Sequence, residues 1–216
     1  MYHRIDGSCY RQIFVAGDVH GCYQALQQQL QARAFDPQQD LVIAVGDVID
    51  RGPQSLSCLG LLDAPWFRMV LGNHEQMALM ALLSGVEFNW QRNGGDWFYR
   101  LKGEARSRAE ALIHRCDALP LIIEVANLPQ KIVVAHADYP AGHYLYDQPV
   151  DGEEVVWSRK RITRALEGRG SRIAGADLFI FGHTPLKRPF KFLNQLYLDT
   201  GAVFGGRLSL LRIKSG

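Results

Sequence analysis

Short apolar runs that end in polar residues recur along the first third of this chain. They are IFVAGDVHG at 13–21, LVIAVGDVIDRG at 41–52 and FRMVLGNHE at 67–75. Each run meets a glycine and shows no alternation, which is typical of strands buried on both faces of a sheet. Helical patterns follow the runs at 23–35, 55–64 and 74–85. A period of roughly 30 residues predicts βαβ units in a parallel sheet.

The second half of the chain is dominated by strand patterns. They are LIIEVANL at 121–128, KIVVAHAD at 131–138, LFIFGHTP at 178–185, QLYLDTG at 195–201 and RLSLLRI at 207–213. Residues 86–120 between the two halves are predicted to form a mostly helical insertion. Residues 139–176 are polar and Gly-rich, which predicts a long excursion over the surface. The pattern indicates an α/β protein in which residues 1–216 form one domain.

Five of the predicted strands end in residues that can bind a metal. These candidates are Asp18, His20, Asp47, Asn73, His136 and His183. Ligands of open α/β sheets bind outside the carboxyl ends of the strands, so we expect these side chains to converge there.

The chemistry of this set favours two cations. Carboxylates, imidazoles and one amide, with no thiolate, suit manganese, iron, nickel or zinc. Six side chains are too many for one ion with open positions, but they suit two ions that share Asp47. Two ions roughly 3.5–4 Å apart can lower the pKa of a shared water and neutralise phosphoryl oxygens.

Three further residues complete a phosphoryl-transfer site. His74, next to Asn73, is placed to protonate a leaving-group oxygen, and Asp50 is placed to orient that imidazole. Arg51 offers a forked donor that suits two phosphate oxygens. No covalent intermediate is required.

Each motif also has an ordinary structural interpretation. GDVIDRGP alone fits an aspartate-rich turn, and GNHE alone fits a helix N-terminus capped by Asn73. His3, His114 and His143 are interpreted as surface or core histidines. The metal hypothesis depends on five strand ends carrying ligand-type residues together.

Composition narrows the class of protein. With 47% hydrophobic and 21% charged residues, the chain is typical of a globular protein, and a net charge of +2 gives no reason to expect nucleic acid or membrane partners. No signal peptide or membrane-spanning run is found, so we expect a cytoplasmic protein with four free cysteines. No cysteine is followed six residues later by arginine, which excludes cysteine-based phosphatase chemistry.

The motifs resemble those of a known family. GDVHG at 17–21, GDVIDRG at 46–52 and GNHE at 72–75 are similar to the signature of the phosphoprotein phosphatase branch of the calcineurin-like metallophosphoesterases. VAHAD at 134–138 and FGHTP at 181–185 resemble its downstream histidine motifs. NGGDWF at 93–98, AHADYP at 135–140 and DTGAVFGGRLSL at 199–210 indicate similarity to bacterial PrpA/PrpB-type serine/threonine protein phosphatases, which are related to the phage lambda phosphatase.

This resemblance implies a calcineurin-like metallophosphoesterase fold, with two facing mixed β-sheets flanked by helices, and two divalent ions, with manganese expected. The first ion would be held by Asp18 and His20, the second by Asn73, His136 and His183, and Asp47 would bridge them. His74 with Asp50 would form the acid pair. Arg51 would bind phosphate, and WSR at 157–159 makes Arg159 a further candidate.

The implied activity is hydrolysis of phosphoserine and phosphothreonine in phosphorylated proteins, with phosphotyrosine as a further substrate, by direct attack of a metal-activated water. One position departs from the pattern, because Leu71 stands where these phosphatases usually have a basic residue. LGNH is also found in diadenosine tetraphosphate hydrolases of the same superfamily, so a dinucleoside polyphosphate hydrolase is the alternative. Asp50 and Glu75 favour the phosphatase.

Overall fold

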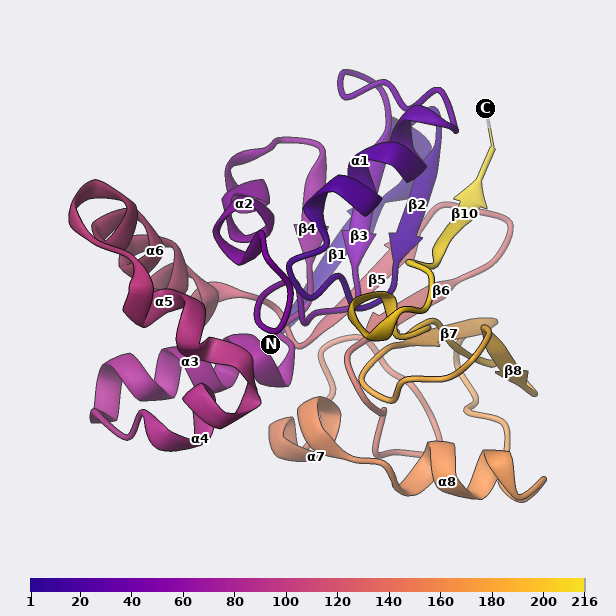
Figure 1. Cartoon of the computed structure of the whole chain (residues 1–216). Helices are drawn as coiled ribbons and strands as arrows, with labels where there is room; N and C mark the ends of the chain where they lie inside the picture. Colours follow the sequence, from indigo (N-terminus) through magenta and orange to yellow (C-terminus); the bar gives the residue numbers. More distant parts are fainter. Residues whose placement is uncertain (216) are drawn as a thin grey trace.

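Two mixed β-sheets form the centre of the protein (Figure 1). The computed structural model describes residues 1–215. One sheet has the order β10-β2-β3-β4, in which the last three strands are parallel and β10 is antiparallel to β2. Its strands are β2 (Ile13–Ala16), β3 (Leu41–Ala44), β4 (Phe67–Met69) and β10 (Leu210–Lys214). This arrangement confirms the parallel βαβ units predicted from the apolar runs.

The second sheet has the order β1-β5-β6-β7-β9-β8. Parallel and antiparallel pairs both occur in it, as when β6 runs parallel to β7 but antiparallel to β5. Its strands are β1 (Tyr2–Asp6), β5 (Ile122–Ala126), β6 (Ile132–Ala135), β7 (Leu178–Phe181), β8 (Phe190–Phe192) and β9 (Gln195–Tyr197). The sequence pattern did not predict β1 or β8, which lie at the two edges of the sheet.

The two sheets face each other across an apolar core. Alternate residues of β2 point in opposite directions, so that Ile13 and Val15 enter the core between the sheets, whereas Phe14 and Ala16 face the helices. On β6, Ile132 enters the same central core. Because both faces of these strands are buried, their sequences are continuously apolar.

Helices cover the outer faces of both sheets (Figure 1). The first sheet is covered by α1 (Tyr23–Gln31), α2 (Ser55–Leu59) and α3 (Asn73–Ser84), with the 3₁₀ turns η2 (Gly60–Asp63) and η4 (Cys116–Ala118) nearby. The second is covered by α7 (Gly152–Trp157) and α8 (Lys160–Leu166). The predicted fold of two facing mixed sheets flanked by helices is therefore confirmed.

The segment 139–176 is more ordered than its composition suggested. It contains α7 and α8, and its Tyr139, Val155 and Ile162 are buried against the outer face of the second sheet. The segment thus runs over the outer face of the second sheet, and its two helices form because apolar residues at helical spacing are scattered among its polar residues.

Residues 86–120 fold mainly as helices beside α3. They form α4 (Phe88–Trp90), the π-helical turn η3 (Gln91–Gly95), α5 (Asp96–Arg100) and α6 (Gly103–Arg115). Two 3₁₀ turns lie elsewhere, η1 (Gly7–Cys9) and η5 (Ala202–Phe204). None of the helices within residues 1–215 has the length and apolar character that crossing a membrane requires.

Candidate active site

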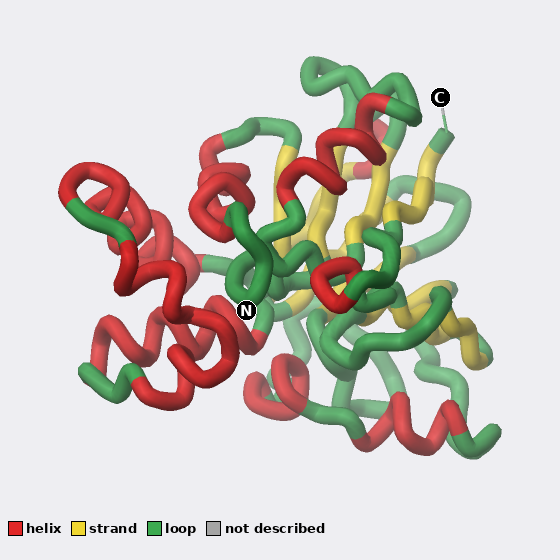
Figure 2. The backbone as a smooth tube through the Cα atoms, in the orientation of Figure 1, coloured by secondary structure: helices red, strands yellow, loops and turns green. Residues whose placement is uncertain are grey.

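Five of the six predicted metal ligands lie in loops at one edge of the two sheets, and the sixth is the first residue of a helix at the same edge. Figure 2 shows these loops in green, converging where the strands end. Asp18 and His20 follow β2, Asp47 follows β3, Asn73 begins α3 after β4, His136 follows β6, and His183 follows β7. None of the six is more than 6% exposed. The sheets thus bring together residues that are far apart in the sequence.

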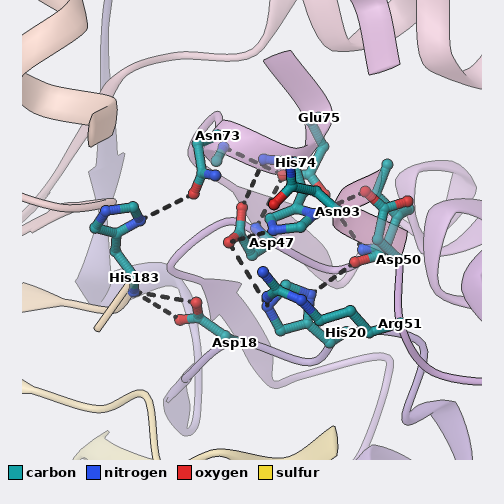
Figure 3. A network of polar contacts seen from close by, with 12 residues as sticks. Asp18, His20, Asp47, Asp50, Arg51, Asn73, His74, Glu75, Asn93 and His183 are labelled. Carbon is teal, nitrogen blue, oxygen red and sulfur yellow. Dashed lines mark hydrogen bonds and ion pairs between the residues drawn. The ribbon is translucent and has the colours of Figure 1, made fainter. Parts of the chain in front are cut away.

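Asp47 lies at the centre of this group (Figure 3). Its Oδ2 is 3.7 Å from His20 Nε2, and its Oδ1 is 3.5 Å from His136 Nε2. Two clusters whose potential ligand atoms lie within 4.8 Å of one another share this carboxylate: His20, Asp47 and His74 form one, and Asp47, His136 and His183 form the other. One oxygen faces each cluster, which is the arrangement that a bridging ligand requires.

Asn73 joins the second cluster through its side-chain carbonyl. Its Oδ1 lies 2.9 Å from His136 Nε2 and 2.9 Å from His183 Nδ1. The other ring nitrogen of His183 is buried without a hydrogen-bond partner among residues 1–215. Buried polar atoms seldom stay unpaired, so this donor set fits a bound cation.

The protonation state of the histidines suits metal binding. His20 Nδ1 donates to the carbonyl of Ile49 at 2.8 Å, and His136 Nδ1 donates to that of Val45 at 2.7 Å. Nε2 of each ring therefore carries the lone pair that a metal ion needs. Burial lowers the pKa of His20 to about 3 and that of His183 to about 3, so both imidazoles are neutral at neutral pH.

The loops that carry these groups are held in an unusual backbone conformation. His20, Asp47, Asp50, Arg51 and His183 all have positive φ values between 43° and 74°. Residues other than glycine rarely adopt this left-handed region, and such strain concentrates at functional sites. The surrounding structure therefore holds these five residues in conformations that local preference disfavours.

Asp18 lies beside the loop that carries His183. Its two oxygens accept the backbone N–H of His183 at 3.0 and 3.1 Å, and His74, not Asp18, completes the cluster with His20 and Asp47. Gly182 permits this approach, because a Cβ there would lie 2.1 Å from the Asp18 carboxylate. The assignment of Asp18 as a ligand of the first ion stays a prediction.

His74 and Asp50 form the predicted pair. His74 Nδ1 lies 2.7 Å from Asp50 Oδ2, and both side chains are at most 1% exposed. Burial opposes a charge on His74, but the charge of Asp47 and the hydrogen bond to Asp50 outweigh it and raise the pKa of His74 above its ordinary value. The remaining ring nitrogen, Nε2, is 3.9 Å from Asp47 and faces the site.

The two candidate arginines differ in how directly they reach the site. Arg51 is exposed, and its Nη1 donates to His20 Nε2 at 2.5 Å. Arg159 precedes α8 and is exposed. Burial lowers the pKa of His183 most, and the nearby charge of Arg159 contributes in the same direction, which places this guanidinium within electrostatic range. Phosphate binding by either residue stays a prediction.

Glu75 has a role that the sequence analysis did not assign. It is fully buried and accepts the backbone N–H groups of Asp47 at 2.8 Å, Val48 at 2.9 Å and Gly72 at 3.2 Å. One carboxylate therefore holds the loop after β3 against the start of α3. The signal was its place three residues into the first turn of α3, where an acidic side chain can bind free N–H groups.

Leu71 contacts apolar residues of the core. It is half-buried and packs against the core beneath the helices, and its N–H donates to Pro120 O at 2.9 Å. The position usually taken by a basic residue thus contributes to apolar packing in this protein.

Metal affinity is expected to fall at low pH. Burial, with the charges of Asp199 and Asp47, raises the pKa of Asp18, and burial raises the pKa of Asp199 to about 6. Protons then compete with cations for Asp18, and a proton on Asp199 changes the charge beside it, whereas His20 and His183 are already neutral and release no proton. Calorimetric titration with Mn²⁺ should show weaker binding at about pH 6 than at about pH 8, with proton release.

The Asp18→Asn variant provides the control for this titration, because it removes one of the competing protons. A smaller pH dependence is expected in it. Equal affinity for Mn²⁺ at both pH values in the unmodified protein would contradict the prediction.

A layered α/β fold that gathers carboxylates and histidines at its strand ends is the fold and site of a metallophosphoesterase. The family model "Calcineurin-like phosphoesterase" matches residues 11–187, and this chain belongs to that family. The family binds divalent metals, in keeping with the two clusters.

Two of the relatives are similar to this chain over nearly their full length. Serine/threonine-protein phosphatase 1 of Salmonella typhimurium is 51% identical over 99% of this chain and 97% of its own length. Serine/threonine-protein phosphatase 2 of Escherichia coli is 46% identical over 99% and 98% of the two chains. A solved structure titled as a putative diadenosine tetraphosphatase has a TM-score of 0.72 and 23% identity, covering 98% of this chain and 93% of its own. At that identity the likeness concerns the fold alone.

Proposed function

We propose that this protein is a metal-dependent serine/threonine protein phosphatase. The observation that carries the proposal is the site in which two clusters share Asp47, and in which His74, a member of one cluster, is hydrogen-bonded to Asp50. The full-length similarity to two serine/threonine-protein phosphatases supports the choice of substrate class. Phosphorylated proteins would be its partners, and its four free cysteines suit the cytoplasm.

Each cluster supplies ligands for one divalent ion in this proposal. His20 and Asp47, with Asp18, would hold the first ion, and Asp47, Asn73, His136 and His183 would hold the second. The oxygen and nitrogen donors suit Mn²⁺, with iron, nickel and zinc as alternatives. Two such ions would lower the pKa of a water and neutralise the phosphoryl oxygens.

The chain's own residues bind the substrate and move the proton. Arg51 and Arg159 would bind the phosphoryl oxygens with their guanidinium groups. The water oxygen would bond to phosphorus as the ester P–O bond breaks, and His74 Nε2 would give its proton to the departing serine or threonine oxygen. Asp50 would hold His74 Nδ1–H throughout, which keeps the ring oriented and stabilises its positive charge.

Comparing two substrates tests this function. With Mn²⁺ present, phosphate release from a phosphoserine peptide is expected to be faster than ADP release from diadenosine tetraphosphate. A chelator should abolish turnover of the peptide and of p-nitrophenyl phosphate, and added Mn²⁺ should restore both. Faster ADP release would favour the dinucleoside polyphosphate hydrolase, and activity unaffected by the chelator would refute metal dependence.

A further inference from the structure

Two tryptophans of the helical insertion donate hydrogen bonds to the carboxylate of Asp50. Trp90 Nε1 lies 2.9 Å from Oδ2 and 3.1 Å from Oδ1, and Trp97 Nε1 lies 2.7 Å from Oδ1. Trp90 is 1% exposed and Trp97 is half-buried. An indole N–H can only donate a hydrogen bond, and it usually finds an acceptor when it is buried. In this protein the acceptor of both indoles is the carboxylate that pairs with His74.

These donors leave the Asp50 carboxylate little freedom to rotate. Its Oδ2 also receives His74 Nδ1 at 2.7 Å, and its backbone N–H donates to Ser55 Oγ at 2.9 Å. The carboxylate is fully buried, so no water replaces a lost donor without opening the site. Hydrogen bonds to an ionised group are about twice as strong as neutral ones. The helical insertion therefore fixes the orientation of the Asp50 carboxylate, and this carboxylate in turn fixes the orientation of the His74 imidazole.

Gly94 and Gly95 allow the helical insertion to pack closely against the loop that contains Asp50 and Arg51. The carbonyl of Gly94 accepts the backbone N–H of Arg51 at 3.2 Å, and a Cβ on Gly94 would lie 2.7 Å from that nitrogen. A Cβ on Gly95 would lie 2.4 Å from Trp90 Nε1. The run NGGDW at 93–97 is thus shaped by contact with residues 50 and 51, which gives this segment a role near the reaction centre.

We propose that Trp90 and Trp97 are positioning residues for proton transfer by His74, an inference that rests on the proposed phosphatase function. They hold Asp50 so that His74 Nε2 faces the departing oxygen. When the ester P–O bond breaks, a poor leaving group such as a serine alkoxide needs the proton from Nε2. A good leaving group such as p-nitrophenolate departs without it. Losing the indoles should therefore affect the two kinds of substrate unequally.

The test replaces each indole by a ring that cannot donate. Trp90→Phe, Trp97→Phe and the double variant are assayed with phenyl phosphate, p-nitrophenyl phosphate and a phosphoserine peptide, with Mn²⁺ present and bound metal quantified. We expect kcat of the double variant to fall by about tenfold or more on phenyl phosphate and the peptide, but by less than about threefold on p-nitrophenyl phosphate, because only part of the general-acid contribution is lost. Metal content and KM should change little.

Trp66→Phe is the matched control. Trp66 is half-buried, its ring packs against Phe35 and Phe67 in the core, and its Nε1 has no hydrogen bond among residues 1–215. This variant should keep the ratio of the two aryl substrates found in the unmodified protein.

Equal losses on both aryl phosphates, or no loss on either, would overturn the positioning role. If the double variant does not fold, the single Trp97→Phe change at the half-buried ring decides, and an unchanged substrate ratio there contradicts the inference. The aryl comparison needs no protein substrate. Failure of the unmodified protein to dephosphorylate the peptide would instead reject the proposed function.

Discussion

Replacing His74 with asparagine is expected to lower kcat on a phosphoserine peptide by about a hundredfold to ten-thousandfold, the usual contribution of a general acid. Asparagine keeps a polar side chain in the buried site, but it cannot deliver a proton through the position of Nε2. The measurement is steady-state kinetics with Mn²⁺, combined with quantification of bound metal in the same preparation. Metal content is expected to stay near that of the unmodified protein.

This experiment also distinguishes between two roles for His74, as a general acid and as a metal ligand. The geometry groups it with His20 and Asp47 as a potential metal-binding set, while its Nδ1 pairs with Asp50. Loss of metal in parallel with activity would make His74 a ligand and remove it from the acid role. His114→Asn on the exposed face of α6 is the matched control, because it makes the same chemical change far from the cluster and should alter neither quantity.

The convergence of candidate ligands that follow strands of one sheet could be predicted, because strand geometry requires it. Parallel strands such as β2 and β3 end at the same edge of a sheet, so residues that directly follow them must be neighbours. Asp47 and His136 follow strands of different sheets, and their side chains come within 3.5 Å because the two sheets face each other and their loops meet at one edge. An apolar run followed by a glycine and a polar residue shows, in a single sequence, where a strand ends and which side chain lies at that end.

Side-chain direction within the loops could not be predicted in the same way. The left-handed backbone at Asp47 and His183 is imposed by tertiary contacts, including the hydrogen bonds from the loop after β3 to Glu75. Local propensity disfavours these conformations for residues other than glycine, so no sequence pattern indicates them. The carboxylate of Asp18 turns toward the N–H of His183 for a similarly long-range reason.

The remaining differences also arise from contacts between distant segments. Strand β1 pairs in parallel with β5, so Tyr2 lies opposite Ile122, and such a pairing depends on the completed sheet. In the sequence, Trp90 and Trp97 belong to a segment predicted to be helical. Only the folded structure shows that their indole N–H groups donate to Asp50. A sequence pattern predicts which residues are buried. It is a poorer guide to which polar atoms form hydrogen bonds with each other.

Replacing Asp47 with asparagine is expected to cause the largest loss of all, on the order of a thousandfold or more in kcat/KM. In the proposed mechanism each of the two ions contributes several kcal/mol to the transition state, and both would depend on this carboxylate. The amide oxygen can still accept the backbone N–H of His74, which now donates to Asp47 Oδ1 at 2.9 Å, so the loop should keep its shape. The amide nitrogen, however, cannot bind a cation.

Bound metal distinguishes this expectation from simple misfolding. Asp47→Asn should retain less than half the metal of the unmodified protein, while its circular dichroism spectrum stays unchanged. Asp117→Asn, an exposed residue of η4, makes the same change in charge and should keep full activity and metal. Full metal content in Asp47→Asn would show that each cluster binds its ion without the shared carboxylate. The two ions would then be independent, because the bridge through Asp47 is the contact by which the two clusters are joined into one site.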